Sequence, residues 1–182
     1  MRLFIAVNFN YETQSLLLEL RDELRSRSAD GNFSAPENLH MTLAFLGECS
    51  AKQTAAAKAC MDALHFQPFT VMIDRVGRFK GGGGGDGALS KATWWAGTDE
   101  SGQLINLHHD LTGRLIEAGF ELDRRKFSPH ITLGREVETD TTPWAVDPFG
   151  ETITSIELMK SERVGGKLTY TAIYAVTGKA TR

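Results

Sequence analysis

Two stretches, ENLHMTLAFLGE (37–48) and FSPHITLGRE (127–136), contain the same pattern, His-x-Thr-Leu, as residues 40–43 and 130–133. The copies lie 90 residues apart (130 − 40), and each follows a Phe-Ser pair and a proline. Matched motifs at long range indicate a duplicated unit, because independent strands rarely share their lead-in sequence. We therefore expect residues 1–182 to form a single domain of two similar lobes, each presenting one copy of the motif.

Hydrophobic periodicity predicts alternating strands and helices around these motifs. Leucines 16, 17, 20 and 24 line one side of a predicted helix, and Ser50 with Gln53 fits a helix-starting capping box. Helices are predicted at 11–28, 50–64 and 101–119, and strands at 3–7, 40–47, 69–76, 88–97, 130–137, 153–160 and 167–176. A shift of 90 residues places helix 11–28 on helix 101–118 and strand 3–7 on strand 93–97, which supports the duplication.

The composition fits a globular protein, with 41% hydrophobic and 24% charged residues. A net charge of −3 argues against a broad basic face for long nucleic acid, since such binding neutralises many phosphates. Any nucleic-acid contact is therefore expected to be limited to an end of the strand or a single nucleotide. Cys49 and Cys60 match neither a CxxC pair nor a zinc-finger framework, and we expect free thiols, no membrane span and a cytoplasmic protein that is a monomer.

The chemistry of the motif follows from strand geometry. Residues two apart project from the same face, so His40 points with Thr42, and His130 points with Thr132. If the lobes are related by approximate two-fold symmetry, the two polar pairs can face each other across a cleft. We expect the two pairs to be functional. A single His-x-Thr in a strand is commonly structural, whereas two matched copies indicate function.

Two opposed imidazoles suit in-line displacement at phosphorus, where the attacking water loses a proton and the leaving oxygen gains one. Histidine titrates near neutral pH, so one ring can be neutral while the other is charged. The threonine hydroxyls can donate to the non-bridging phosphate oxygens. This scheme requires neither a metal nor another cofactor, and a 2′,3′-cyclic phosphate is a natural substrate for it.

The chain resembles the two-histidine phosphoesterase superfamily, in particular the RNA 2′,3′-cyclic phosphodiesterases first called 2′-5′ RNA ligases. The resemblance rests on the opening MRLFIAV, the two motif stretches and the closing SERVGGKLTYTAIY (161–174). It implies an α+β, bilobed, pseudo-two-fold fold with two antiparallel sheets flanking a central cleft and helices outside. It also implies that His40 protonates the leaving 3′ oxygen and that His130 activates water, leaving a 2′-phosphate.

The same resemblance places a phosphate-binding arginine after the second motif, at Arg135. Strict alternation would turn Arg135 away from His130, but Gly134 can permit a bulge that reverses this. A surface charge is the alternative interpretation of Arg135.

Other polar and aromatic features carry weaker signals. The glycine-rich loop 81–87 lacks the Gly-Lys-Ser/Thr of a phosphate loop, and it leaves only Arg78 and Lys80 as basic groups nearby. Adjacent histidines on a helix point about 100° apart, so we expect His108 and His109 to be solvated or partly packed. Packing or charged-loop roles are also favoured over base or RNA contacts for a further set: Phe4, Phe9, Trp94, Trp95, Arg124, Arg125 and Lys126.

Three functions remain open from the sequence. The first is hydrolysis of RNA 2′,3′-cyclic phosphate ends to 2′-phosphates, with reversible 2′-5′ ligation. The second is the same chemistry on a small nucleotide, such as a cyclic phosphate of ADP-ribose. The third is a nucleotide-binding module without turnover, which two intact proton carriers argue against.

Overall fold

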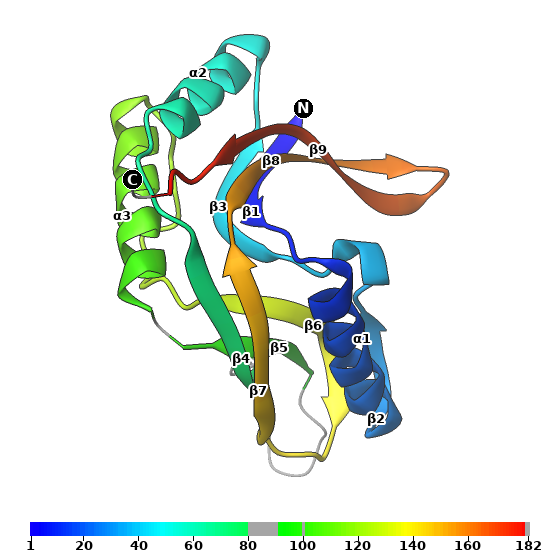
Figure 1. Cartoon of the computed structure of the whole chain (residues 1–182). Coiled ribbons are helices and arrows are strands. Elements are labelled where there is room, and N and C mark those ends of the chain that lie inside the picture. The colour runs from blue at the N-terminus through cyan, green and yellow to red at the C-terminus, as the bar shows by residue number, and fades with distance from the viewer. Residues whose placement is uncertain (80–90, 100, 181–182) are drawn as a thin grey trace.

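The structure, a computed structural model, describes residues 1–79, 91–99 and 101–180, and it is an α+β fold (Figure 1). Its helices are α1 (Tyr11–Ser26), α2 (Ala51–Asp62) and α3 (Gly102–Glu117), with one 3-10 turn, η1 (Pro36–Asn38). Its strands are β1 (Arg2–Val7), β2 (Ser28–Phe33), β3 (Met41–Glu48), β4 (Phe69–Arg78), β5 (Ala92–Thr98), β6 (His130–Thr139), β7 (Trp144–Ile153), β8 (Ser155–Val164) and β9 (Lys167–Thr177).

These strands form one antiparallel sheet in the order β7-β4-β5-β6-β3-β1-β8-β9, and β2 also pairs with β6. The predicted α+β antiparallel class is confirmed. The expectation of two separate sheets is corrected, because the two halves join where β3 meets β6. That junction is the single register pair Met41–Ile131, the residues that follow the two motif histidines.

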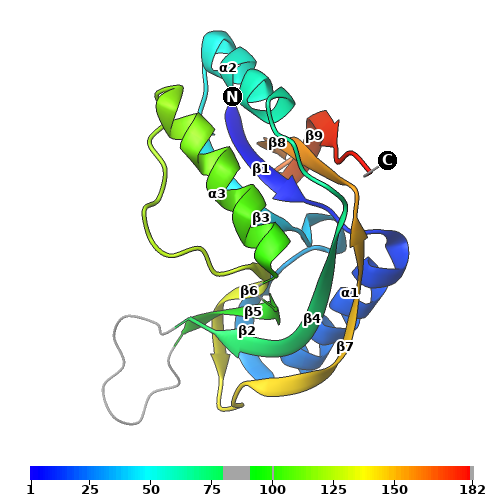
Figure 2. The same ribbon diagram turned by 60° about the vertical axis from the view of Figure 1, so that its left-hand side comes forward.

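The two halves have matching strand orders. The order β3-β1-β8-β9 corresponds to β6-β5-β4-β7, and the 90-residue shift places β1 on β5, α1 on α3 and β3 on β6. Two helices, α1 and α3, pack across the junction: α1 contacts β2, β6 and β7, while α3 contacts β3 and α2 (Figures 1 and 2). This exchange ties the halves together and agrees with the predicted duplication within one domain, which stays a prediction.

The core explains why these segments fold as they do. Leu17, Leu20 and Leu24 bury one stripe of α1, whereas Leu16 is exposed, so the predicted stripe was one residue too wide. The leucines of α3 are all buried as predicted: Leu104, Leu107, Leu111 and Leu115. The capping box of α2 is confirmed, since Ser50 and Gln53 each accept from the other's backbone N–H.

Two strands, β2 and β7, were not predicted from the sequence. The β2 sequence SADGNF has no apolar alternation, and β7 contains Pro148 at the edge of the sheet, where a missing N–H is tolerated. Both strands form through pairing with β6 or β4 instead of through their own hydrophobic pattern. Among the described residues, no helix has the length and apolar character to cross a membrane. The glycine-rich loop 81–87 and Lys80 lie outside the described residues.

Candidate active site

A cavity of about 950 Å³ opens where the two halves of the sheet meet. All five residues predicted for the site line it: His40, Thr42, His130, Thr132 and Arg135. Its other lining residues come mainly from β1, β2, η1, β3, β8 and β9: Arg2, Phe4, Asn32, Phe33, Ser34, Ala35, Asn38, Phe45, Glu48, Ser161, Glu162, Arg163, Lys167, Leu168 and Tyr170.

Strand alternation positions the motif side chains. Met41 and Ile131 are fully buried on the core side of the sheet, while Thr42 and Thr132, one residue further along each strand, are half-buried and line the cavity. Each motif thus uses its apolar residues to fix the strand in the core. The polar residues are left on the open face.

His40 is held on several sides. Its Nδ1 donates to the carbonyl of Asn38 at 2.7 Å, and its Nε2 lies 3.0 Å from the Thr42 hydroxyl. The ring centroids of Phe4 and Tyr170 lie 4.9 and 5.2 Å from that of His40. The imidazole is therefore fixed in orientation before any ligand binds.

His130 has the same backbone anchor in a more open setting. Its Nδ1 donates to the carbonyl of Ser128 at 2.8 Å, and the edge of Phe79 packs against it with ring centroids 4.9 Å apart. The Nδ1 hydrogen bond to a carbonyl fixes the tautomer of both neutral rings, because a carbonyl can only accept. Each neutral histidine therefore carries its free lone pair on Nε2.

The surroundings also set the protonation of both rings. Burial lowers the pKa of His40 and of His130 below 6.5, and the backbone hydrogen bonds from Nδ1 do not fully offset this. The Arg135 guanidinium lowers both pKa values further, and the charge of His130 lowers that of His40. The free protein thus favours neutral imidazoles, and an anion bound beside them would favour the charged form.

Arg135 reaches the cavity through a β-bulge. Between the register pairs Trp94–Gly134 and Trp95–Thr132, β6 has one more residue than β5. The extra residue reverses the alternation and turns Arg135 to the face of His130. Gly134 suits this bend, because a Cβ there would lie 2.8 Å from a methyl group of Val137.

The hairpin of β8 and β9 forms a wall of the cavity that was not predicted from the sequence. Tyr170 lies in the closing stretch KLTYTAIY and packs on both Phe4 and His40. The tip of this hairpin is fastened to η1, since Lys167 pairs with Glu37 and Asn38 donates to the carbonyl of Leu168. The closing stretch was the only signal in the sequence, and it gave no indication of a contact with His40.

Several predicted alternatives lie outside the cavity lining. Trp94 is fully buried in the core, Phe9 is buried, and Trp95 packs against Gly77 and Gly97. His108 is half-buried and stacks on Phe127 with ring centroids 3.8 Å apart, as expected for a packed histidine. The other residues in this group are exposed and do not line the cavity: Arg78, His109, Arg124, Arg125 and Lys126. Phe4 is the one aromatic candidate that lies at the cavity.

The stretches of chain that the structure describes contain no group of three or more His, Cys, Asp or Glu side chains arranged to hold a metal ion. The functional side chains that do converge are two imidazoles, two hydroxyls and one guanidinium. Such a set can move protons and hold an anion.

Comparison with known proteins agrees with this geometry. Residues 7–85 match the family described as LigT like Phosphoesterase. The RNA 2′,3′-cyclic phosphodiesterase of Archaeoglobus fulgidus is 32% identical over 83% of this chain and 85% of that protein, and the one from Thermotoga maritima is 31% identical over 74% and 70%.

Solved structures match over nearly the whole chain. The crystal structure of Escherichia coli LigT complexed with 3′-AMP superposes with a TM-score of 0.81 at 27% identity, covering 97% of each chain. The shared fold and the level of identity to curated members lead to one assignment. The chain belongs to the LigT-like family of phosphoesterases, which includes the RNA 2′,3′-cyclic phosphodiesterases.

Proposed function

We propose that this protein hydrolyses RNA 2′,3′-cyclic phosphate ends to 2′-phosphates by acid and base catalysis between His40 and His130, without a metal. The observation that carries the proposal is the matched anchoring of the two rings. Each donates from Nδ1 to a backbone carbonyl and keeps Nε2 for proton transfer in one shared cavity. The names of the relatives support the choice of substrate.

The proposed reaction assigns one task to each group. His130 takes a proton from water as its oxygen attacks phosphorus, and His40 gives a proton to the leaving O3′ as the P–O3′ bond breaks. The new P–O bond comes from water, and the 2′ ester bond stays intact. The histidines end with their protonation states exchanged, and proton exchange with solvent restores them.

The remaining groups bind the phosphate. Arg135, Thr42 and Thr132 donate to the two non-bridging oxygens, whose negative charge grows in the transition state. Binding of this anion also raises the pKa of the nearby His40, which allows it to carry the proton that it must give away. The reverse reaction, 2′-5′ ligation, uses the same groups, because a catalyst accelerates both directions.

The proposal includes a cellular setting. We place the protein in the cytoplasm, as a monomer, with RNA or a nucleotide bearing a 2′,3′-cyclic phosphate as its partner. Cys49 and Cys60 are buried free thiols, which suits a reducing compartment.

The test is an assay of an oligonucleotide with a 2′,3′-cyclic phosphate end, in excess EDTA, with identification of the product isomer. We expect full turnover and a 2′-phosphate. A matched oligonucleotide that already ends in a 3′-phosphate is the control, and it should stay unchanged. Loss of turnover in EDTA, a 3′-phosphate product, or tight binding with no product would each contradict the proposal.

A further inference from the structure

His40 depends on an anchor that lies outside the sheet. Its Nδ1 donates at 2.7 Å to the carbonyl of Asn38, the last residue of the three-residue turn η1. The backbone N–H of Asn38 donates to the Ala35 carbonyl at 2.9 Å, so the turn closes on itself. Among the described residues, η1 takes no part in the pairing of the strands. Contacts with other elements must therefore fix the position of the His40 anchor.

The hairpin of β8 and β9 supplies such a contact through the side chain of Asn38. Asn38 Nδ2 donates to the backbone carbonyl of Leu168 on β9 at 3.3 Å. Two residues further along β9, Tyr170 packs edge-on against His40, with ring centroids 5.2 Å apart and an interplanar angle of 85°. We call Asn38, Leu168 and Tyr170 the hairpin clamp. Together with His40 they form a closed cycle of contacts.

The amide group of Asn38 adds little to the stability of the fold. Its Oδ1 atom is buried and has no hydrogen-bond partner among the residues that the structure describes. Burying an acceptor without a partner is destabilising, and an apolar side chain of similar size would avoid that cost. The small net gain favours a role in positioning over a role in stability.

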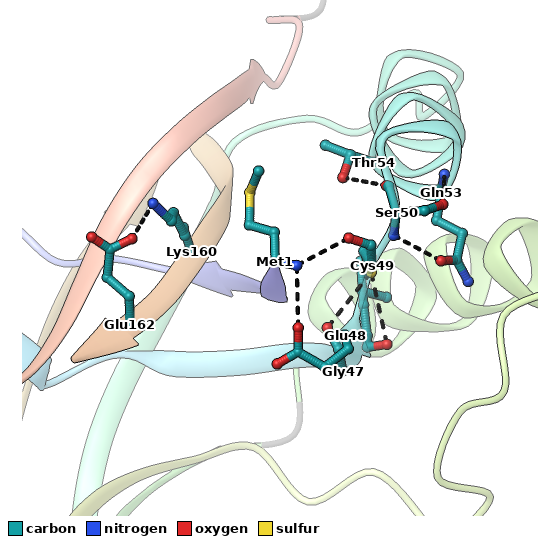
Figure 3. A network of polar contacts seen from close by, with 10 residues as sticks. Met1, Gly47, Glu48, Cys49, Ser50, Gln53, Thr54, Lys160 and Glu162 are labelled. Atoms are coloured by element: carbon teal, nitrogen blue, oxygen red, sulfur yellow. Dashed lines mark hydrogen bonds and ion pairs between the residues drawn. The ribbon is translucent and has the colours of Figure 1, made fainter.

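The charged groups of the hairpin do not replace the Asn38 contact. Lys167 pairs with Glu37 of η1, but both side chains are exposed, and exposed ion pairs between long side chains hold two elements weakly. Glu162 lines the cavity from β8 and pairs with Lys160 of the same strand (Figure 3). Asn38 has a shorter side chain and a backbone partner, so it fixes the turn more closely.

His130 provides an internal reference for the clamp. Its Nδ1 has an anchor of the same kind, the Ser128 carbonyl at 2.8 Å, and its ring packs against Phe79, which follows β4. Neither Ser128 nor Phe79 belongs to η1 or to the hairpin. A change in the hairpin clamp should therefore alter His40 and leave His130 as it is.

We propose that the β8–β9 hairpin positions His40 for proton transfer, with Asn38 and Tyr170 as the positioning residues. Asn38 ties the carbonyl that anchors His40 to β9, and Tyr170 fixes the plane of the imidazole. Together they keep Nε2 of His40 directed into the cavity. The inference rests on the proposed function for the task of His40 as proton donor, whereas the orientation of the ring is a property of the free protein.

The first test observes the tautomers of both histidines in the free protein by nitrogen NMR, well above pH 6.5, where both rings are neutral. In the unaltered protein the proton should lie on Nδ1 of each ring. In Asn38→Leu a substantial fraction of His40 should carry the proton on Nε2, while His130 keeps it on Nδ1. An unaltered His40 signal in this variant would overturn the proposal.

The second test compares kcat for an oligonucleotide with a 2′,3′-cyclic phosphate end and for its analogue with sulfur at the bridging 3′ position. A thiolate leaves without a proton, so the analogue does not need the acid. Asn38→Leu and Tyr170→Leu should each lower kcat about tenfold with oxygen and less than about twofold with sulfur, as expected for a misplaced catalytic group. Equal losses with both substrates, where sulfur rescues His40→Ala, would overturn the proposal.

Matched variants separate positioning from general damage. Tyr170→Phe retains the ring that packs on His40, so it should recover most of the rate that Tyr170→Leu loses. Asn106→Leu changes an exposed asparagine of α3 that does not line the cavity, and it should keep both rates. A loss in Asn106→Leu equal to that in Asn38→Leu would refute the assignment.

The two tests also distinguish failure of the clamp from failure of the proposed function. If no cyclic phosphate end is hydrolysed, the proposed function fails, and the tautomer measurement still decides the clamp. If sulfur rescues His130→Ala and not His40→Ala, the acid and base are exchanged, and the tautomer measurement again decides. In either case a mixed tautomer of His40 in Asn38→Leu supports the clamp, and a retained one refutes it.

Discussion

The two motif strands have the same pattern but different surroundings. On β3, His40 lies between Phe4 and Tyr170, and its Nε2 already contacts the Thr42 hydroxyl. On β6, His130 has one aromatic neighbour among the described residues, Phe79, and no described hydrogen bond at Nε2. The duplication of the motif therefore supplies two equivalent imidazoles, and the residues around them make the two sites unequal.

This difference bears on the roles of acid and base. The motif itself cannot distinguish them, since both rings present Nε2 to the cavity and both have a lowered pKa. Burial is the largest cause of the lowered pKa of both rings, and the rings of Phe4 and Tyr170 enclose His40 on two sides. A bound phosphate would favour the charged form of either imidazole, so experiment must decide the two roles.

The largest expected effect is on removal of either imidazole. His40→Ala and His130→Ala should each lower kcat by about 10²–10⁴-fold, because each loses one proton transfer. A substrate with sulfur in place of the bridging 3′ oxygen separates the roles, since a thiolate leaves without a proton. It should restore much of the rate in the His40 variant and none in the His130 variant.

His109→Ala is the matched control, because His109 is exposed on α3 and should keep the full rate with both substrates. Rescue of the His130 variant by the sulfur substrate would reverse the assignment of acid and base. Equal rescue of both variants would show that the roles are not divided in this way.

The next effect concerns Arg135, a cation that acts on both histidines. Arg135→Ala should lower kcat/KM about 100-fold through loss of a phosphate ligand, and Arg135→Lys should recover some of it. It should also shift the pH dependence. In the unaltered protein the pKa of each histidine is lowered below 6.5, so the fall of kcat/KM that marks loss of the acid's proton should begin below pH 6.5.

Without Arg135 both pKa values rise, and the falling limb should move to higher pH. The measurement is kcat/KM from about pH 5 to 9 for both proteins. Arg125→Ala is the control, since Arg125 is exposed and paired with Asp123. A lower rate with an unmoved pH profile would mean that Arg135 binds phosphate without setting the protonation of the histidines.

The smallest effect concerns the threonines. Thr132→Val should lower kcat/KM about tenfold through loss of a phosphate donor. Thr42→Val should cost less, about threefold, because its hydroxyl must first exchange a bond to His40 for a bond to phosphate. The Thr→Ser variants retain the hydroxyl and serve as controls, and a larger loss at Thr42 would contradict this ranking.

Much of the site was predictable because it depends on local periodicity. Alternation in HMTL and HITL turns His and Thr to one face and the apolar residues to the core, whatever lies around them. The match at an offset of 90 residues (130 − 40) indicated that the strands are equivalent. Together these features identified His40, Thr42, His130 and Thr132 as a set.

Only the tertiary structure decided how that set is completed. The turn of Arg135 into the cavity depends on a register shift against β5, and the enclosure of His40 by Tyr170 depends on where the hairpin of β8 and β9 lies. The strands β2 and β7 likewise form through pairing with β6 and β4, which are distant in the sequence. The hydrophobic period of a strand determines which way each side chain faces. Register and packing arise from contacts between segments far apart in the chain, and no local sequence pattern encodes those contacts.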